Sequence, residues 1–315
     1  MELNKAKNIE RIRQLSLLFM LLEIVLFSLL AERFFSFSNA ISILRQVSVT
    51  GISAMGMFMI ILLGDIDLSV GSMYAFIGVI SALIFKTTES AVLAIIAALV
   101  IGTVIGFING TITAKFKIPA FITTLATMSV CSGLAYIITK GTPIGVTNPA
   151  FTFLGSGYVA GVIPLPIIFM LIVLALGYFT MYKTRFGRHI YACGGNAQAA
   201  KWSGINADKI KVLVFVIAGF LNGFAAIVLA GRLGGGLPSA GDGSEMDVIT
   251  AVVLGGTSMT GGKGKLWGVV LGVLIIGVLT VGLTMVGVSS YWQNVIKGII
   301  IVVAVIIDTK GTKTA

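Results

Sequence analysis

The stretch "LLGDIDLSVGSMY", residues 62–74, interrupts what would otherwise be a continuous apolar sequence. Asp65 and Asp67 lie two residues apart within it, and Gly64 and Gly71 flank them. A charged side chain in the hydrocarbon of a bilayer costs roughly 3 kcal/mol or more. The stretch therefore predicts either a short loop at a membrane surface or an interrupted backbone that lines a polar path.

The composition of the chain indicates that this stretch belongs to a membrane protein. Of the 315 residues, 57% are hydrophobic and 11% are charged, and the mean hydropathy is +1.04. Soluble domains carry about 25% charged residues, so the chain is predicted to lie in a membrane. Its two cysteines, Cys131 and Cys193, are predicted to be unpaired thiols. A single histidine, His189, excludes a zinc site built on a histidine pair.

Apolar runs of 17–25 residues are long enough to cross a bilayer, and they predict the fold class. We expect an all-α, polytopic membrane protein of about ten transmembrane helices with interrupted helices and a cytoplasmic coupling helix. The transmembrane domain spans 15–307, between a cytoplasmic N-terminal segment, 1–14, and a cytoplasmic tail, 308–315. The predicted runs, of which the eighth is short for a full crossing, are 15–31, 42–63, 68–85, 91–113, 118–138, 162–182, 210–231, 246–256, 266–286 and 292–307.

The distribution of basic residues predicts the orientation. Ten crossings put both termini on one side, and most of the 22 lysines and arginines then fall on that side. The positive-inside rule makes this side the cytoplasm, so both ends are expected inside. Membrane topology thereby explains the net charge of +10, because no basic domain with interleaved aromatics indicates a nucleic-acid partner. The first run has no A-x-A cleavage site after it and is expected to be a retained helix.

Glu23 and Lys297 are charged residues that fall inside predicted spans. Glu23 lies within the first run, and its role is left unassigned. Lys297 follows Tyr291 and Trp292, which are expected to anchor the last span at the membrane interface. We expect Lys297 to extend its ammonium group outward to the interface.

Small residues predict where helices pack closely. The segments "GTVIGFING", residues 102–110, and "GFLNG", residues 219–223, each place glycines four residues apart on one helix face. Such spacing allows backbones to approach in lipid, where no hydrophobic force draws helices together.

A second glycine-rich interruption, "VLGGTSMTGGKGKLWG", occupies residues 253–268. It aligns with the first when Gly64 is set opposite Gly255, which also sets Gly71 opposite Gly262. Transporters often place interrupted helices at corresponding positions of two halves, with the binding site between them. The residues predicted to line a translocation pathway are Asp65, Asp67, Ser69, Gly255, Gly256, Thr257 and Ser258.

Either aspartate has a simpler alternative role as a helix cap. Asp67 is the better cap candidate, because it can accept hydrogen bonds from the amides of Ser69 or Val70. Asp65 would then be free to face the pathway or a partner. If "GDID" lies at the inner surface, both carboxylates lie beside a helix N-terminus, where the backbone dipoles favour negative charge.

A basic loop, residues 183–209, contains a candidate docking helix. Asn196 can cap a short helix over 197–203, and Gly204 can close it. A helix this short is marginal in water, so it requires something to dock against. Ala199 and Ala200 form a small face that suits a partner's groove, and the alternative is a helix folded back on its own bundle.

The chain shows no energy source of its own. In "TGGKGK", Gly264 follows Lys263 where a phosphate-binding loop needs serine or threonine, so the Walker pattern fails. Energy for uphill transport must come from an ion gradient or from another polypeptide. An intramembrane enzyme is also disfavoured, because no histidine base or metal cluster accompanies Ser258.

Five blocks carry a resemblance to a known family. They are "GDIDLSVGSMYA", "FITTLATM", "TRFGRHIYACGGNAQAAKWSGINADKIK", "AVVLGGTSMTGGKGKLWGVVLG" and "GVSSYWQNVIKGIIIVVAVIID". In order and spacing over nearly the whole chain they resemble the ribose/galactose-type permeases of bacterial sugar ABC importers. Asp65 departs from the family pattern, which is expected to have glycine there.

The resemblance implies a homodimer in the bacterial inner membrane, with a cytoplasmic ATP-binding cassette subunit and an extracytoplasmic sugar-binding protein. It implies that Asn196, Ala199, Ala200 and Gly204 belong to the coupling helix that contacts the ATPase. ATP and Mg²⁺ would be held by that partner, with no cofactor in this chain.

The function that follows is a transport subunit rather than an enzyme. The expected cargo is a monosaccharide, ribose first, and the alternatives are galactose, xylose or a sugar-like signalling molecule. A carrier that works alone on an ion gradient is the alternative of a different class.

Overall fold

The computed structural model describes the backbone of residues 2–313 and the side chains of residues 16–306. In this part of the chain almost all regular structure is helical, as predicted. The helices are α1 (Glu2–Leu30), α2 (Phe37–Leu62), α3 (Val70–Thr88), α4 (Ala91–Lys115), α5 (Ala120–Thr139), α6 (Pro149–Ser156), α7 (Leu165–Lys183), α8 (Arg185–Gly195), α9 (Ala197–Trp202), α10 (Ala207–Leu233), α11 (Ser244–Leu254), α12 (Leu266–Met285) and α13 (Ser290–Lys313).

Four two-residue strands complete the described elements: β1 (Ile144–Gly145), β2 (Tyr158–Val159), β3 (Ile163–Pro164) and β4 (Gly235–Gly236). They form two small antiparallel pairs, β1 with β4 and β2 with β3.

Seven helices in the described part are long and apolar enough to cross a membrane: α2, α3, α4, α5, α7, α10 and α12. Each coincides with a predicted run. The other three predicted runs are the shorter apolar segments Ser16–Leu30 and Ser290–Ile306 and the 11-residue helix α11. The chain is therefore a multi-pass membrane protein whose eighth apolar run is indeed too short to cross alone.

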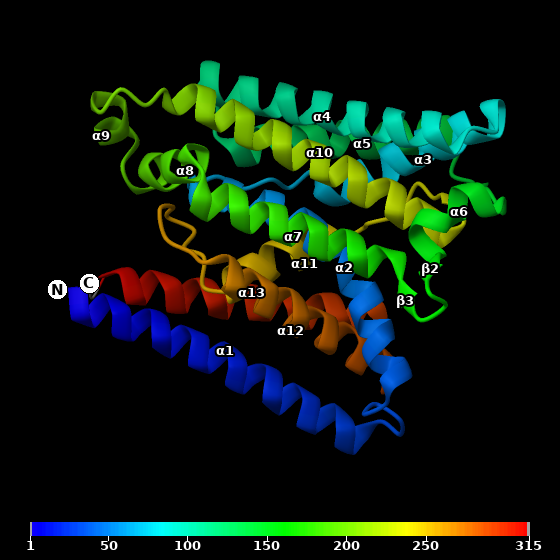
Figure 1. The fold of residues 1–315 in the computed structure, drawn as a ribbon, viewed down its shortest axis with the longest axis horizontal. Coiled ribbons are helices and arrows are strands. Elements are labelled where there is room, and N and C mark those ends of the chain that lie inside the picture. The colour runs from blue at the N-terminus through cyan, green and yellow to red at the C-terminus, as the bar shows by residue number, and fades with distance from the viewer. Residues whose placement is uncertain (1, 314–315) are drawn as a thin grey trace.

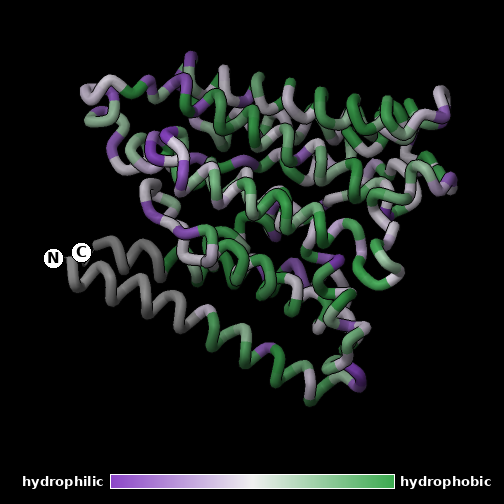
Figure 2. Tube along the Cα trace, viewed as in Figure 1, coloured by the Kyte–Doolittle hydropathy of each residue, from purple (hydrophilic) through white to green (hydrophobic). Residues whose placement is uncertain are grey.

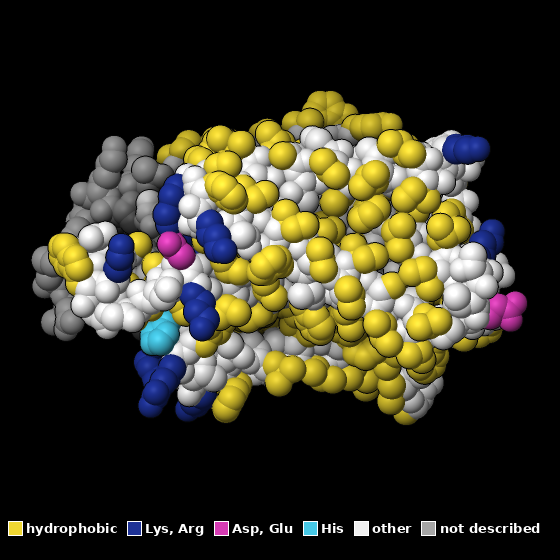
Figure 3. Space-filling model, turned by 90° about the horizontal axis from the view of Figure 1, so that it is seen from above, with side chains coloured by type: hydrophobic (Ala, Val, Ile, Leu, Met, Phe, Trp, Pro, Cys, Tyr) yellow, Lys and Arg dark blue, Asp and Glu magenta, His cyan; other side chains and the backbone are white. Residues whose placement is uncertain are grey.

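The long helices run side by side along the molecule (Figure 1). The start of α1, the end of α13 and the helices α8 and α9 lie at the same end. Hydrophobic residues fill the middle of the helices, and hydrophilic residues concentrate towards the ends (Figure 2). On the face drawn in Figure 3, an apolar belt separates a group of lysines and arginines at one end from a few charged residues at the other. The side chains of the predicted terminal segments, 1–14 and 308–315, lie outside the described residues.

Burial separates an inner from an outer set of helices. In α2, 78% of the apolar window is buried, and in α3 and α10 the figure is 67%, whereas in α4 and α5 it is 22%. The inner helices carry the two glycine-rich interruptions or contact them, so the interruptions lie within protein rather than in lipid.

The glycine segments of α4 and α10 pack directly against each other, which confirms their predicted role. A Cβ added at Gly219 would lie 2.2 Å from the carbonyl oxygen of Gly102, and one added at Gly106 would lie 2.2 Å from that of Phe215. Only glycine allows the backbones to come this close, and the van der Waals packing that this allows helps to associate helices in a bilayer.

Candidate functional site

The first interruption is a non-helical segment, residues 63–69, between α2 and α3. Helix α2 ends where the amides of Gly64 and Asp65 donate to the carbonyls of Ile61 and Ile60. Gly64 has φ +77°, a left-handed conformation that glycine adopts without strain. Helix α3 begins only at Val70, so the backbone between the two helices depends on side chains and neighbouring elements for its hydrogen bonds.

Asp67 organises the start of α3. Its Oδ1 accepts hydrogen bonds from the Ser69 amide at 2.8 Å and from the Ser69 hydroxyl at 2.6 Å, and its side chain is buried. The predicted bond to the Ser69 amide is confirmed, although the residue in the N-cap position is Ser69 itself. Asn109 of α4 lies beside Ser69, at 3.5 Å from its hydroxyl, and accepts a hydrogen bond from Thr127 of α5. A polar chain thus joins three membrane helices.

Asp65 is not free, which corrects the sequence-based interpretation. Its Oδ2 lies 2.7 Å from Nζ of Lys211 on α10, and the two side chains are 12% and 27% exposed. The prediction failed because the partner lies far away in sequence and only the packing of α10 brings it near. Next to this ion pair, the Leu68 amide donates to the Thr124 hydroxyl of α5 at 3.1 Å.

The second interruption, residues 255–265, folds into a compact glycine-rich loop between α11 and α12. The Ser258 amide donates to the carbonyl of Lys263 at 2.9 Å, and the hydroxyls of Ser258 and Thr260 lie 3.0 Å apart. Gly256, Gly261 and Gly262 all have positive φ. Local hydrogen bonds and glycine therefore determine the loop's shape.

The two interruptions touch each other and α8. The Gly262 amide donates to the carbonyl of Leu62 at 2.8 Å, at the end of α2. A Cβ added at Gly194 of α8 would lie 1.7 Å from the same Leu62 oxygen. The Tyr191 hydroxyl of α8 donates to the carbonyl of Gly264 at 2.9 Å. Burial raises the pKa of the Tyr191 phenol above its ordinary value, which keeps the hydroxyl protonated as a donor.

A third interruption was missed by the sequence analysis. Between α10 and α11 the chain runs back along α3, so that a Cβ added at Gly71 would lie 2.2 Å from the carbonyl oxygen of Gly241 and 2.4 Å from Oε2 of Glu245. The starts of α3 and α11 thus meet inside the bundle. The repeated glycine–carboxylate pattern "GDGSEMD", residues 241–247, is the signal that could have revealed this segment.

Lys297 does not extend outward, contrary to the prediction. Its side chain is 9% exposed, and Nζ lies 2.7 Å from Oδ1 of Asp247 on α11. A carboxylate and an ammonium group that are both buried lose hydration, and their mutual attraction offsets part of that cost. Tyr291 and Trp292 are exposed, as expected of interfacial anchors.

Four of the seven residues predicted to line a pathway are buried by their own chain, and Asp65, Gly255 and Gly256 are partly buried. Asp67, Ser69, Thr257 and Ser258 are each 3% exposed or less. Gly255 and Gly256 follow α11, and a Cβ added at Gly255 would lie 2.4 Å from the carbonyl oxygen of Gly268 in α12. Their contact with a transported molecule stays a prediction.

The predicted docking helix exists as α9. The Oδ1 atom of Asn196 accepts a hydrogen bond from the Ala199 amide at 2.9 Å, and Gly204 follows the helix with φ +83°. Ala199 and Trp202 are exposed, whereas Ala200 is 4% exposed. Ala200 therefore packs against its own chain, which corrects the expected docking face. One face of the helix folds back on its own chain and the other is open, so docking of the open face on a partner stays a prediction.

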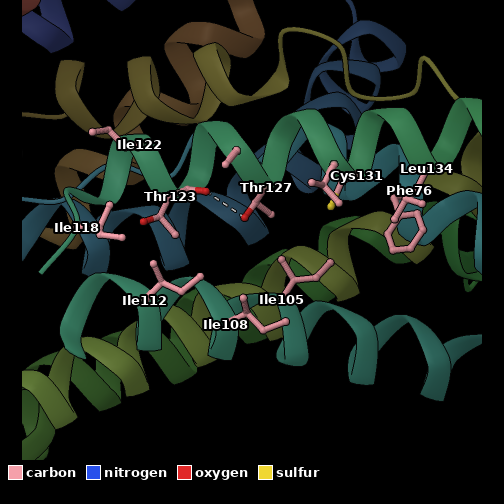
Figure 4. Close-up of a pocket in the computed structure, with 12 residues that line it drawn as sticks. Phe76, Ile105, Ile108, Ile112, Ile118, Ile122, Thr123, Thr127, Cys131 and Leu134 are labelled. Atoms are coloured by element: carbon pink, nitrogen blue, oxygen red, sulfur yellow. Dashed lines mark hydrogen bonds between the residues drawn. The ribbon is translucent and has the colours of Figure 1, made fainter. Parts of the chain in front are cut away.

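An apolar groove lies between α4 and α5 (Figure 4), with a volume of about 460 Å³. Isoleucines dominate its lining, together with Phe76 of α3. The hydroxyl of Thr127 already donates to Asn109 and also lies 3.1 Å from the Thr123 carbonyl, so the lining offers few groups to bond a polar ligand. The groove is suited to apolar chains and not to a sugar.

A bundle of apolar helices with interrupted helices at its centre and an exposed short helix at its basic end defines a membrane transport protein. The family described as "Branched-chain amino acid transport system / permease component" matches residues 39–305. The chain belongs to this permease family and is a transport subunit rather than an enzyme.

Known proteins of similar sequence cover nearly the whole chain. A ribose import permease protein of Haemophilus influenzae is 45% identical over 307 residues, covering 96% of this chain and 95% of the relative. The ribose import permease protein of Escherichia coli K12 is 43% identical over 301 residues, covering 94% of each chain. A xylose transport system permease protein of Haemophilus influenzae is 34% identical, covering 89% of this chain and 91% of the relative. No solved structure matches the fold.

Proposed function

We propose that the chain is the transmembrane permease subunit of an ATP-driven ABC importer that carries a monosaccharide, ribose first, across the bacterial inner membrane. Higher identity to relatives named for ribose than to the one named for xylose supports this choice of cargo. Galactose, xylose and a sugar-like signalling molecule are the alternatives.

The observation that carries the proposal is the position of α9. This capped helix presents Ala199 and Trp202 outward, and the adjoining α8 contacts both glycine-rich interruptions. A separate cytoplasmic subunit that binds ATP and Mg²⁺ would dock on α9 and move the interruptions through α8. The basic residues at this end of the bundle support a cytoplasmic location, with both termini inside.

The complete importer would contain two copies of this chain surrounded by membrane lipid. An extracytoplasmic sugar-binding protein would deliver the cargo at the opposite end. Because the pathway residues are polar but largely uncharged, specificity would belong mainly to that binding protein.

The test is reconstitution in proteoliposomes with and without the two partner proteins. Uptake of radiolabelled ribose should require the binding protein outside, and the ATPase with ATP on the side of α9, with galactose and xylose as competitors. Uptake by this chain alone, driven by an ion gradient, would instead establish the carrier alternative.

A matched pair of substitutions tests the docking helix. Ala199→Glu places a charge on the exposed first turn of α9 and should abolish co-purification of the ATPase. Ala150→Glu places the same charge on the exposed first turn of α6, at the other end of the bundle, and should leave ATPase binding intact. Equal ATPase binding by both variants would remove α9 from the interface.

A further inference from the structure

The helix that follows the docking helix is tied to two different loops by ion pairs. Asp208 and Lys211 lie three residues apart in the first turns of α10, so they lie on neighbouring positions of one helix face. Asp208 pairs with Lys117 in the connection between α4 and α5. Lys211 pairs with Asp65 in the first interruption, at 2.7 Å.

The two ion pairs differ in their exposure to water. The side chains of Lys117 and Asp208 are 66% and 57% exposed, whereas those of Lys211 and Asp65 are 27% and 12% exposed. Exposed pairs contribute little because water screens them and both side chains lose entropy. A shielded pair resists separation, because each partner would be left as a desolvated charge. The pair of Asp65 and Lys211 is therefore the firm connection.

The connection from α9 to this ion pair is short and hydrogen-bonded. The Ile205 amide donates to the carbonyl of Ala200, and Asn206 caps α10 by accepting the Lys209 amide at 2.9 Å. Lys211 lies two residues after Lys209, near the start of α10. The connection between α9 and α10 is therefore only residues 203–206, and the hydrogen bond from Ile205 to Ala200 ties it back to α9.

The far side of the ion pair is the backbone that leads into α3. Residues 65–69 are non-helical, and Asp67 and Ser69 then set the start of α3. Gly71, in the first turn of α3, contacts Gly241 in the third interruption. A force applied at Asp65 therefore reaches the place where the starts of α3 and α11 meet.

We propose that Asp65 and Lys211 are positioning residues that transmit the movement of α9 to the first interruption, in addition to the contacts made by α8. This inference rests on the proposed function, since it assumes that an ATPase moves α9. In the assembled importer, loss of the ion pair uncouples ATP hydrolysis from sugar uptake without preventing assembly.

The test compares sugar taken up per ATP hydrolysed in the reconstituted complex of permease, ATPase and binding protein. The double variant Asp65→Asn/Lys211→Met removes both charges, so that neither is left unpaired. Its ratio of uptake to hydrolysis should fall by at least about fivefold, the lower end of coupling between linked sites. Lys211→Arg keeps the charge pair and should keep the ratio.

The exposed ion pair provides the matched control. Lys117→Met/Asp208→Asn likewise removes one positive and one negative charge, one of them from α10, and should leave the ratio within about twofold of the unmodified complex, because a screened surface pair is weak. The ratio is measured per purified complex, so a lower yield of any variant does not obscure it.

Three results would overturn the inference: an unchanged ratio in Asp65→Asn/Lys211→Met, an equal fall in the control pair, or an equal fall in Lys211→Arg. A failure of the proposed function looks different, because the unmodified complex would then show no ATP-dependent uptake at all.

Discussion

Replacing Gly219 with alanine is expected to destabilise the permease, because the added methyl group forces α10 and α4 apart. The added Cβ would lie 2.2 Å from the carbonyl oxygen of Gly102 and 2.8 Å from the Cα of Gly106. These are backbone atoms, which cannot rotate away as a flexible side chain can. Gly133→Ala in α5 is the matched control, because a Cβ there meets no atom within 4 Å.

The magnitude follows from the size of the clash. Real Cβ atoms essentially never come closer than 3.0 Å to another heavy atom of this kind. The helices must separate by roughly 1 Å, and a gap of that size loses about a quarter to a half of the dispersion energy of the contacts that it opens. Overpacking of this kind costs about 1–3 kcal/mol. The helix preference of alanine over glycine, about 1 kcal/mol, acts equally in both variants and cancels in the comparison.

Gly219→Ala should therefore be less stable than Gly133→Ala by about 1–3 kcal/mol. The measurement is unfolding of each purified permease in mixed micelles as denaturing detergent increases, followed by the loss of helical circular dichroism. Equal unfolding midpoints for the two variants would refute the close contact between α4 and α10.

Three further predictions concern charged and thiol side chains. Asp67→Ala leaves the amide and hydroxyl of Ser69 without their buried acceptor, at about 1–3 kcal/mol for each group, so the folded yield on size exclusion should fall; an unchanged yield would contradict the cap. Lys297→Met should lower the folded yield more than Lys297→Met/Asp247→Asn, because the single variant leaves a buried carboxylate unpaired; the reverse order would refute the ion pair. Burial raises the pKa of the Cys193 thiol, so less thiolate is present at pH 8 and its maleimide labelling, followed by mass spectrometry, should be slower than that of glutathione and continue to rise at higher pH. Labelling as fast as that of glutathione would contradict this prediction.

Much of the fold is a local property of the chain and was therefore predictable. Transfer of an apolar run into lipid depends on the residues of that run, which is why the runs 42–63 and 91–113 correspond to α2 and α4. Capping is equally local, and Asn196 closes α9 through an amide three residues away. The bond from Ser69 to Asp67 and the glycine faces of α4 and α10 were predictable for the same reason.

What only the tertiary structure decided is which distant groups meet. Asp65 lies between α2 and α3 and Lys211 lies on α10, far along the chain, so no local sequence pattern links them and Asp65 was wrongly expected to be free. Lys297 was wrongly expected to reach the interface, because its partner Asp247 lies on a helix too short to be assigned a clear orientation from sequence. Ala200 was assigned to the wrong face of α9, since six residues carry too little periodicity to show which side folds back. The turn-rich segment before α11 has no apolar period at all, so its path along α3 is determined by close packing of glycine backbones, which a linear pattern does not encode.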